Sequence, residues 1–377
     1  MRTLVLNAGS STLKVSLVAG RDQTEARTTV GWGDESSRQA GRREESLHHA
    51  LARLGIERDG AARIDAVGHR VVHGGGRWTA SVRVDEAIAA ELSALGALAP
   101  LHNPVALETL EAARRILPDL PQIAAFDTAF HAALPEAWRR YPVPDRWTSD
   151  WGVRRYGFHG LSVGWSVRRA GELLGRPPDD LRLVVAHLGS GCSVTAVDSG
   201  RSAMTSMGMT PLEGLMMGTR AGSIDPGILL ALLQEGRLPL ERLSDELEHA
   251  SGLLAVSGTS ADVRQLAAEA ARGEPRAALA IEMFVVRAAS WIAAAATSLP
   301  RLDALVFTGG IGEHASGVRA AIVQRLGVLG VEPVEARSVD EDVVLGRGSG
   351  GPAVLRIEAR EDLVIAGEVE QLLGVGS

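Results

Sequence analysis

The chain has 377 residues, of which 45% are apolar and 23% charged, and its net charge is -7. This balance is typical of a soluble globular protein with more than one domain, and the net negative charge excludes bulk attraction to nucleic acid or anionic membranes. The single cysteine, Cys192, excludes an internal disulfide. The N-terminal apolar run is too short for a signal peptide, and no later run approaches the roughly 18 to 20 apolar residues of a membrane span. We therefore expect a cytoplasmic protein.

The predicted elements alternate between strands and helices, which indicates the α/β class. Residues 3–6 form an apolar strand that runs into the small-residue turn at residues 7–12, and residues 13–18 then alternate with period two. This pattern predicts a β-hairpin. Residues 21–45 are polar and are expected to form hairpins and connections. Helices are expected over three stretches, residues 87–98, 105–116 and 277–296.

A faint internal repeat connects the two halves of the chain. Residues 5–10 read VLNAGS, and residues 185–190 read VAHLGS, each an apolar strand entering a small-residue turn. A Gly-Arg pair follows each at the same spacing, at residues 20–21 and 200–201. The repeat suggests duplicated domains, with chance similarity as the alternative. One such turn from each half would suit a nucleoside triphosphate held between the two.

Lys14 is the only lysine in the chain, and every other fixed cation is an arginine. A lysine retained at one position suggests a site that needs a compact charge on a flexible stem, as phosphate sites do, whereas drift is the alternative. Because no other lysine exists, a P-loop is excluded, and protein-kinase signatures are absent too. Any phosphate cradle must therefore come from turns such as residues 7–12, whose backbone N–H and hydroxyl groups can bind anions.

Three further segments combine arginine or histidine with glycine. They are residues 68–76, 154–160 and 210–222. Glycine lets a neighbouring arginine approach a ligand closely, although each segment alone could be a structural turn with a solvated charge. His69 and His73, within the first of them, are interpreted as hydrogen-bonded parts of a packed turn, and Cys192 as a small buried residue.

Eight motifs follow one another along nearly the whole chain: VLNAGSSTLK, GHRVVHGG, PLHNP, FDTAFH, RRYGFHG, TSMGMTPLEGLMMGTR, FTGGIGE and REDLVIA. In sequence and order they resemble the motifs of acetate kinases. The resemblance implies two duplicated actin-like, ribonuclease-H-like domains, with mixed sheets flanked by helices around a nucleotide cleft. We expect residues 1–131 with 363–377 in the first domain and residues 132–362, with most of the nucleotide site, in the second. A homodimer is also implied.

The resemblance implies a reaction centre built from six side chains. Asn7 and Glu361 would hold Mg²⁺ or Mn²⁺, directly or through water. Arg70 and Arg220 would grip the carboxylate and the transferring phosphoryl group. His159 would donate to that group in the transition state, and Asp127 would orient the site. A structural role for Asp127, as a cap or strand-end acid, is the alternative.

The remaining implied residues bind the acyl group and the nucleotide. The pocket for the acyl methyl group would consist of Val72, Leu101, Phe158 and Pro211, with His102 lining the site. The first phosphate hairpin would contribute Ser10, Thr12 and Lys14. The second phosphate loop and the adenosine loop would contribute His187, Leu188, Gly189, Ser190, Gly191, Gly309, Gly310, Ile311, Gly312 and His314. The residues near the adenine would be Asp262, Val263 and Arg264.

The implied reaction is reversible, direct in-line phosphoryl transfer between ATP and acetate, giving acetyl phosphate and ADP. A carboxylate is already ionised near neutral pH, so it needs cations rather than a general base. A propionate or butyrate kinase is the nearest alternative, because one methylene changes binding by only about 1 to 3 kcal/mol. A sugar kinase, with Asp127 as general base, and a nucleotide-binding protein of actin-like fold are the others.

Four positions depart from the family pattern. Residues 161–163 read Leu-Ser-Val where the family often has Thr-Ser-His. Ser190 and His314 stand where asparagine is usual, and Val263 stands where the family can place an aromatic residue. None of these changes removes a charge from the implied reaction centre, but they leave the nucleotide preference open. The sequence also leaves open the acyl chain length and the physiological direction.

Overall fold

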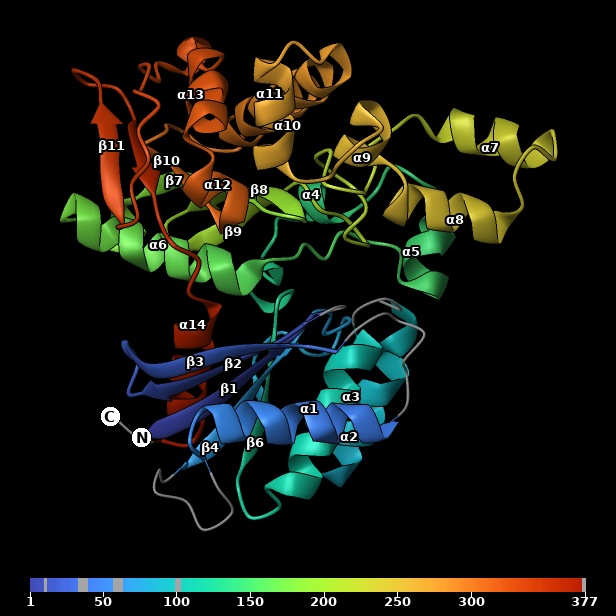
Figure 1. Ribbon diagram of the computed structural model, residues 1–377, viewed down its shortest axis with the longest axis vertical. Coiled ribbons are helices and arrows are strands. Elements are labelled where there is room, and N and C mark those ends of the chain that lie inside the picture. Colours follow the sequence, from blue (N-terminus) through green and yellow to red (C-terminus); the bar gives the residue numbers. More distant parts are fainter. Residues whose placement is uncertain (10–11, 33–39, 57–63, 99–102, 375–377) are drawn as a thin grey trace. The chain divides into compact units, whose positions relative to one another are not determined.

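The structure, a computed structural model, describes residues 1–9, 12–32, 40–56, 64–98 and 103–374 (Figure 1). The chain forms two compact units. Unit 1 comprises Met1–Ala132, Phe158–Trp165 and Arg360–Ser377, and unit 2 comprises Ala133–Gly157 and Ser166–Ala359.

Unit 1 is built on a six-stranded mixed sheet in the order β3-β2-β1-β4-β6-β5. The strands β1, β4 and β6 are parallel to one another, and β2, β3 and β5 pair antiparallel with their neighbours. The strands are β1 (Arg2–Ala8), β2 (Thr12–Ala19), β3 (Gln23–Gly31), β4 (Ala66–Val71), β5 (Val82–Arg83) and β6 (Gln122–Phe126). The helices are α1 (Ala40–Arg53), α2 (Glu86–Ala94), η2 (Leu95–Leu98), α3 (Asn103–Ile116), η3 (Ala129–His131) and α14 (Glu361–Leu372).

Unit 2 contains a second six-stranded sheet, in the order β11-β12-β10-β7-β8-β9. Its strands are β7 (Arg182–Leu188), β8 (Cys192–Asp198), β9 (Arg201–Thr205), β10 (Ala304–Thr308), β11 (Val343–Arg347) and β12 (Ala353–Arg356). Its helices are α4 (Glu136–Arg139), α5 (Asp145–Trp151), η4 (Pro178–Asp180), α7 (Pro226–Gln234), α8 (Leu240–His249), α9 (Gly252–Ser257), α10 (Val263–Ala271), α11 (Pro275–Ala296), α12 (Gly309–His314), α13 (Ser316–Gln324) and η5 (Gly327–Leu329). Helix α6 (Gly160–Leu174) begins in unit 1 and continues in unit 2.

The two sheets have the same topology. In each, a three-stranded antiparallel meander, β1-β2-β3 or β7-β8-β9, is followed by two parallel strands, β4 and β6 or β10 and β12. A short antiparallel edge strand, β5 or β11, lies before the last parallel strand in the chain and beside it in the sheet. The fold class expected from the sequence, two mixed sheets flanked by helices, is confirmed, and the matching topology agrees with duplication.

The two faces of the unit 1 sheet pack against different helices. Leu4 and Leu6 of β1 share a buried cluster with Leu47 of α1, and successive strand residues point to opposite faces. On the other face α14 contacts β1 and β4 (Figure 1). Gly68 of β4 permits this approach, because a Cβ atom there would lie 2.5 Å from the Cγ2 atom of Ile365. The N-terminus of α14 is thereby fixed beside the sheet.

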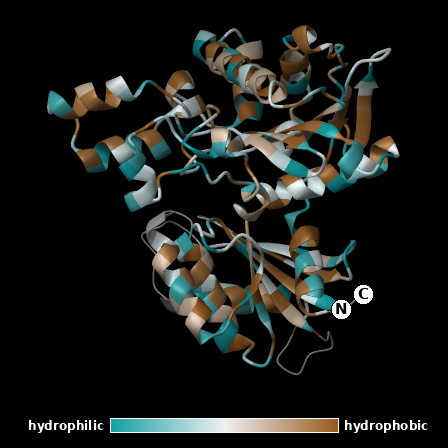
Figure 2. Ribbon diagram, turned by 180° about the vertical axis from the view of Figure 1, so that it is seen from behind, coloured by the Kyte–Doolittle hydropathy of each residue, from teal (hydrophilic) through white to brown (hydrophobic). Residues whose placement is uncertain are grey.

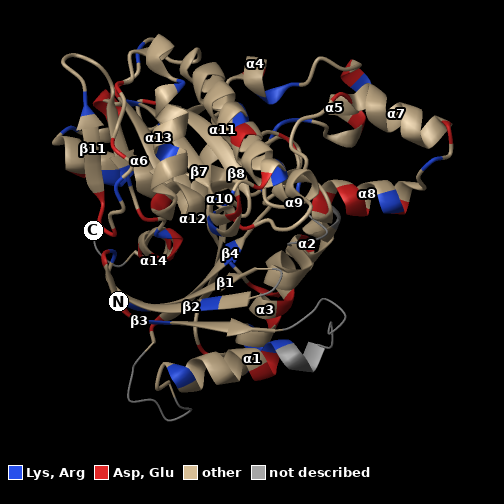
Figure 3. Cartoon of the chain, turned by 45° about the horizontal axis from the view of Figure 1, so that its top comes forward, with Lys and Arg blue, Asp and Glu red and all other residues tan. Residues whose placement is uncertain are grey.

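Helix α11 is long and apolar enough to cross a membrane by length and composition, so the expectation that no stretch would reach this length is wrong. It contacts β7, β8, α9, α10 and α13, and its buried face includes Phe284 and Ile292. These contacts are those of a core helix in unit 2. Apolar segments also cluster on the strands of each unit (Figure 2), whereas helices such as α8 carry acidic and basic residues together (Figure 3).

Most expected elements are present where the sequence placed them. The N-terminal hairpin is β1-β2, and its repeat is β7-β8. The three expected helices correspond to α2 with η2, to α3 and to α11. Strand β3 pairs antiparallel with β2 in a hairpin, as expected for part of residues 21–45, whereas the start of helix α1 in this region was not expected.

The two units differ from the expected domains mainly at residues 158–165. The sequence placed this segment in the second domain, whereas it groups with unit 1 in the structure. Backbone contacts account for the difference, since the N–H group of Gly160 donates to the carbonyl oxygen of Asp127 at 2.9 Å. The C-terminal division falls before residue 360 rather than before residue 363.

Candidate functional site in two parts

Four of the expected site residues meet in unit 1 around Arg70. The Arg70 Nε atom donates to both carboxylate oxygens of Asp127, at 3.0 and 3.1 Å, and Nη1 donates to Asn7 Oδ1 at 3.1 Å. The Nη2 atom makes a further bond to Asp127. Glu361 Oε2 lies 3.6 Å from Arg70 Nε and accepts a 2.8 Å hydrogen bond from Asn7 Nδ2. We call these four residues the Arg70 cluster.

The sheet brings the Arg70 cluster together. Strands β1, β4 and β6 are neighbours and run parallel, so their C-terminal ends share one edge. Asn7 lies near the end of β1, Arg70 near the end of β4, and Asp127 directly after β6. Glu361 begins helix α14, which Gly68 allows to approach β4. Strand order therefore brings Asn7, Arg70 and Asp127 together, and the packing of α14 on β4 adds Glu361.

Burial and electrostatics within the cluster shift two of its pKa values. Burial raises the pKa of Asp127 to about 6, with the attraction of Arg70 opposing the rise and the nearby charge of Glu361 adding to it. Burial also works against the charge of Arg70, but Asp127 and Glu361 outweigh it and raise the Arg70 pKa above its usual range. Arg70 therefore stays charged and interacts with both carboxyl groups of the cluster.

The oxygen atoms of Asn7 and Glu361 fit a hard divalent cation. Mg²⁺ prefers amide and carboxylate oxygens, and it commonly takes one or two protein ligands together with water and substrate phosphates. Among the described residues no group of three or more His, Cys, Asp or Glu side chains could hold a metal alone. A sparse donor set of amide and carboxylate oxygens is the arrangement expected for a metal that arrives with a phosphate ligand.

His159 has an unusual backbone conformation. Its φ angle is +61°, in the left-handed region that non-glycine residues seldom adopt, at a cost of about 1 kcal/mol or more. The carbonyl group of His159 accepts a hydrogen bond from Val163 N at 3.0 Å. His159 therefore lies directly before the first turn of α6. Gly160 follows it without a side chain, and a Cβ atom there would lie 2.2 Å from the Asp127 carbonyl oxygen. The backbone on both sides of His159 is thus tightly constrained.

Two members of the expected acyl pocket are buried in unit 1. Val72 is 6% exposed and Phe158 is 1% exposed. The ring of His73 contacts Phe158 edge-on, with the ring centroids 5.5 Å apart. His73 is itself fixed by Asn103, which accepts from the His73 backbone N–H and donates to its carbonyl oxygen, each at 3.0 Å. The other expected members on the unit 1 side, Leu101 and His102, lie outside the described residues.

The first phosphate hairpin is partly described. Gly9 N donates to the carbonyl oxygen of Thr12 at 2.8 Å, which closes the turn between β1 and β2. Lys14 pairs in the sheet register with Asn7, and its side chain is exposed. The only lysine therefore lies beside the Arg70 cluster in the register of the sheet. Ser10 lies outside the described residues.

In unit 2 the second phosphate loop and the adenosine loop lie side by side. A Cβ atom on Gly309 would lie 2.8 Å from the carbonyl oxygen of Leu188 and 3.1 Å from His187 Nε2. A Cβ atom on Gly189 would lie 3.8 Å from the N atom of Gly310. The expected adenosine loop forms the short helix α12, and around Gly310 the space is open. Of the other loop residues, Ser190 is exposed and Gly191 and Ile311 are half-buried, whereas Gly312 is buried.

Two buried arginines anchor α12, and the sequence analysis missed both. Arg319 donates to the carbonyl oxygens of Gly312 and Glu313, at 2.9 and 2.7 Å. Arg356 lies 3.8 Å from the Glu313 carboxylate, whose Oε1 atom accepts from Ala359 N at 3.0 Å. Arginine is usually exposed, so no local sequence pattern distinguishes these two from surface residues.

Arg220 lies on a loop that is tied to the second phosphate loop. Its Nε atom is 2.9 Å from Glu248 Oε2, and both side chains are 17% exposed. Gly218, two residues earlier, donates from its N atom to the carbonyl oxygen of Ser190 at 3.3 Å. Pro211, the unit 2 member of the expected acyl pocket, is buried on the same loop. Glu248 is a partner that the sequence analysis did not identify.

The residues expected near the adenine differ in exposure. Asp262 caps helix α10 by accepting from Arg264 N at 2.8 Å, and the Arg264 side chain bonds to the same carboxylate at 3.2 and 2.7 Å. These bonds hold the pKa of Asp262 below its ordinary value. Both side chains are exposed, whereas Val263 is only 4% exposed. His314, at the end of α12, is exposed beside Glu313.

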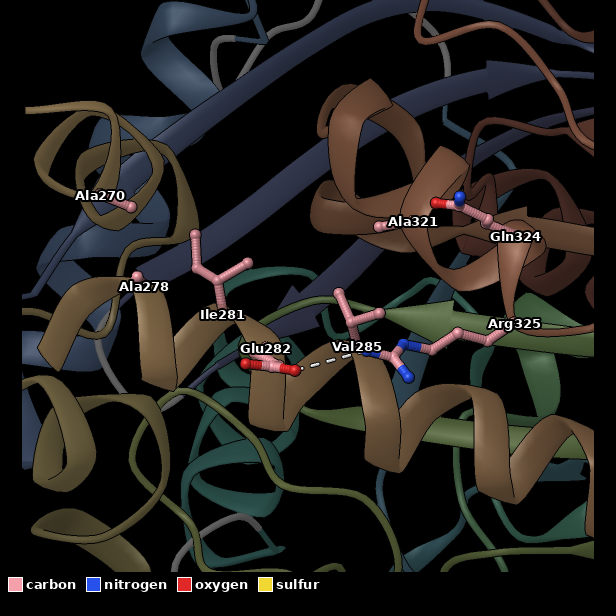
Figure 4. Close-up of a pocket in the computed structure, with 8 residues that line it drawn as sticks. All are labelled: Ala270, Ala278, Ile281, Glu282, Val285, Ala321, Gln324 and Arg325. Atoms are coloured by element: carbon pink, nitrogen blue, oxygen red, sulfur yellow. Dashed lines mark hydrogen bonds and ion pairs between the residues drawn. The ribbon is translucent and has the colours of Figure 1, made fainter. Parts of the chain in front are cut away.

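A groove of about 590 Å³ lies among α10, α11 and α13 in unit 2 (Figure 4). Ile281 and Val285 line it together with three alanines, and the pair Glu282 and Arg325, 3.5 Å apart, lies at its side. None of the expected nucleotide-binding residues lines this groove. It lies further along α10 and α13 than Asp262 and His314, which flank the starts of those helices.

Two buried histidines predict a loss of stability in acid. Burial lowers the pKa of His69 and of His131 to about 4, although hydrogen bonds to Gln122 and to the Phe158 carbonyl oppose the shift. Both imidazoles are neutral in the folded protein, while an unfolded chain protonates them below about pH 6.5. The contribution of these neutral histidines to the free energy of unfolding is therefore complete above pH 6.5. It is lost as the pH falls from 6.5 to 4, by up to roughly 3 kcal/mol for each histidine.

The midpoint of urea unfolding, measured from pH 8 to pH 5, checks this prediction. We expect the midpoint to fall with decreasing pH, and His69→Gln to show a shallower fall because glutamine does not titrate. The same pH dependence in the wild type and in His69→Gln would show that protonation of His69 does not cause the loss of stability in acid.

Comparisons with known proteins agree with the fold. Two sheets of one topology, each with a glycine-containing hairpin turn, define a two-domain protein of the actin-like class. The sequence model of the acetokinase family matches residues 2–367. The chain belongs to the acetokinase family.

Proteins similar in sequence or structure match this chain over almost its full length. An acetate kinase of Deinococcus deserti is 42% identical over 99% of this chain and 98% of its own, and one of Deinococcus radiodurans is 43% identical with the same coverage. The crystal structure of an acetate kinase from Porphyromonas gingivalis covers 99% of both chains at 32% identity, with a TM-score of 0.87. That of a propionate kinase from Francisella tularensis covers 97% of this chain and 98% of its own at 34% identity, with a TM-score of 0.86.

Proposed function

We propose that this protein is an acetate kinase, which transfers a phosphoryl group between ATP and acetate and works in both directions. The Arg70 cluster is the observation that carries the proposal. A guanidinium held by Asp127 suits a small carboxylate, and Val72 and Phe158, which are buried in the same unit, are the proposed contacts of its apolar tail. Membership of the acetokinase family and relatives named acetate kinase support the same activity.

The reaction needs charge neutralisation more than proton transfer. Acetate is already ionised at neutral pH, and its approach to a triphosphate is opposed by repulsion between anions. Arg70 binds the carboxylate, Asp127 fixes the plane of the guanidinium, and Arg220 and His159 donate to the transferring phosphoryl group. Transfer is direct and in line, and the site requires no general base.

The metal proposal rests on Asn7 and Glu361. These residues, directly or through water, would hold Mg²⁺, with Mn²⁺ as a substitute. When bound, the metal neutralises the charge of the β- and γ-phosphate oxygens. Thr12, Lys14 and the turn at Gly9 contribute donors for the phosphates, as does the second phosphate loop from His187 to Gly191. Ser10, which lies outside the described residues, is proposed as a further phosphate donor.

The base is proposed to lie near Asp262, Arg264 and the first turn of α12. The open space around Gly310 allows a ligand to approach the backbone there. Because the side chain of Val263 is buried, we expect its backbone rather than its side chain to contact a nucleotide. His314 and Ser190 then alter hydrogen bonding at the edges of the nucleotide site rather than the chemistry.

We infer that the protein acts as a cytoplasmic homodimer. Helix α7 has no buried residue, and Ile228, Leu230 and Leu233 on it are 51%, 58% and 38% exposed (Figure 2). Such a surface is expected to be covered, and a second copy of this chain is the proposed partner. Light scattering during size-exclusion chromatography would give twice the chain mass, and Leu230→Glu should reduce it.

Val72 should influence which carboxylate is used. Replacing it by alanine removes two methyl groups from the proposed acyl pocket, and each carbon atom of such a contact is worth about 1 kcal/mol. We therefore expect Val72→Ala to raise kcat/KM for propionate relative to acetate by roughly 10-fold. Steady-state kinetics with acetate, propionate and butyrate check this. An unchanged ratio would place the acyl group elsewhere.

The activity is tested by ADP release from ATP and Mg²⁺ with acetate, propionate, butyrate or glycerol as acceptor. The proposal predicts turnover with acetate and none above background with glycerol. Faster turnover with propionate than with acetate would favour a propionate kinase, as in the Francisella tularensis relative. Turnover with glycerol alone would favour a sugar or polyol kinase.

A further inference from the structure

The backbone at His159 differs from ordinary turns in this protein. His159 and Ser199 are the non-glycine residues with positive φ in the described part of the chain. Ser199 precedes Gly200 in the exposed hairpin turn between β8 and β9, where such angles are common. His159 instead stands at the start of α6, where an extended conformation is usual. The left-handed backbone of His159 must therefore be stabilised by contacts with other parts of the fold.

Two hydrogen bonds bracket His159, one on each side. Gly160 N donates to the carbonyl oxygen of Asp127 at 2.9 Å, and His131 Nε2 donates to the carbonyl oxygen of Phe158 at 3.0 Å. Both partners come from one short segment, residues 127–131, which follows β6 and includes η3. The segment that contains Asp127 therefore also forms hydrogen bonds with the peptide groups before and after His159.

The chemistry of the His131 bond is defined by its acceptor. A carbonyl oxygen only accepts, so His131 Nε2 carries the proton. His131 is 2% exposed, and burial lowers its pKa to about 4, so the ring stays neutral near pH 7. The ring of Phe130 packs edge-on against it, with centroids 5.7 Å apart. Buried and fixed in this way, His131 can influence ligands through the backbone that it holds.

We propose that His131 is a positioning residue for phosphoryl transfer: by holding the Phe158 carbonyl group, it keeps the His159 backbone left-handed and its imidazole aimed at the transferring group. The inference rests on the proposed role of His159. A core histidine that merely adds stability is the alternative. The two accounts differ in what happens when His159 is absent, because a positioning residue then has nothing to position.

The test compares His131→Met, which removes the donor at similar volume, with His131→Gln, whose amide N–H can reach the Nε2 position. We expect kcat to fall roughly 10- to 100-fold in His131→Met, with little change in KM for ATP, because the lost interaction acts in the transition state. His131→Gln should recover much of the loss. Gln122→Met is the matched control, since Gln122 is buried and bonds to His69 and to two carbonyl oxygens away from His159.

A double-mutant cycle in the kinetics decides between the two accounts. In the His159→Ala background we expect His131→Met to lower kcat by less than about 2-fold, since coupled residues show non-additive effects. Should His131→Met fail to fold, His131→Asn breaks the same bond, because its shorter amide does not reach the Nε2 position. Active protein is quantified by ATP binding, so that a smaller folded fraction is not counted as a lower kcat.

The outcomes are distinct. Additive losses in kcat, or equal losses in His131→Met and Gln122→Met, would overturn the inference and leave His131 a structural residue. A wild-type kcat in His159→Ala would show that His159 has no role in phosphoryl transfer, and would therefore also overturn the proposed positioning role of His131. Neither result bears on whether acetate is phosphorylated, which the wild-type enzyme answers separately.

Discussion

Replacing Arg70 by leucine is expected to lower kcat/KM for acetate by roughly 10³-fold or more. The guanidinium is the only cation among the four residues of the Arg70 cluster, and it faces Asp127 and Glu361. Its loss removes the proposed carboxylate partner and the cation that interacts with Asp127 and Glu361. Unpaired buried charges are also costly to the fold, typically by about 3 to 5 kcal/mol. Activity and stability should therefore both fall.

A matched control separates the two effects. Arg43 is also buried, pairs with Glu108 at 3.2 Å and lies over the ring of Trp32 at 4.1 Å, away from the cluster. We expect Arg43→Leu to lower the melting temperature while kcat/KM stays within about 3-fold of the wild type. Arg70→Lys is informative as well, because lysine keeps the positive charge but cannot donate two parallel hydrogen bonds to a carboxylate as a guanidinium does. Near wild-type activity in Arg70→Leu would contradict the proposed role.

Replacing Arg220 by alanine is expected to lower kcat by roughly 10²- to 10³-fold, with a smaller effect on stability. Arg220 is as exposed as Arg70, at 17% of each side chain, and its Nε atom lies 2.9 Å from Glu248 Oε2. If Arg220 donates mainly to the transferring phosphoryl group, its loss should appear in kcat more than in the KM for acetate. Steady-state kinetics at saturating ATP measure both parameters.

Two other substitutions make the Arg220 result interpretable. Glu248→Gln keeps the guanidinium but weakens its orientation, so we expect an intermediate loss of kcat. Arg169→Ala removes another half-exposed arginine of unit 2, which pairs with Glu172 and Asp342, and should leave kcat nearly unchanged. A rise in KM for acetate with unchanged kcat in Arg220→Ala would show that Arg220 binds the ground state only.

Much of the unit 1 site could be predicted from the sequence, because its residues follow strands. Asn7, Arg70 and Asp127 each end or follow a strand, and parallel strands bring such positions to one edge. Glu361 joins them because α14 packs on β4 through Gly68, a contact that no local pattern reveals. The resemblance identified these residues, and the geometry explains why they meet.

Other features could not be predicted, because they depend on contacts far apart in the sequence. His131 reads as one more histidine in an apolar segment, and only the fold places it against the carbonyl group of Phe158. The start of helix α1 was missed because residues 40–45, AGRREE, are mostly polar and lack a local apolar pattern. Arg319 and Arg356 were missed because exposure is the usual state of arginine.

The most direct test of the account is chemical identification of the product. ATP, Mg²⁺ and acetate are incubated with the wild-type enzyme and with Arg70→Leu in the presence of hydroxylamine, which converts an acyl phosphate to a hydroxamate that is detected as its coloured Fe³⁺ complex. The account predicts acetate-dependent hydroxamate in step with ADP release in the wild type, and almost none in the variant. ADP release without hydroxamate from any carboxylate, in folded enzyme that binds ATP, would contradict transfer to a carboxylate.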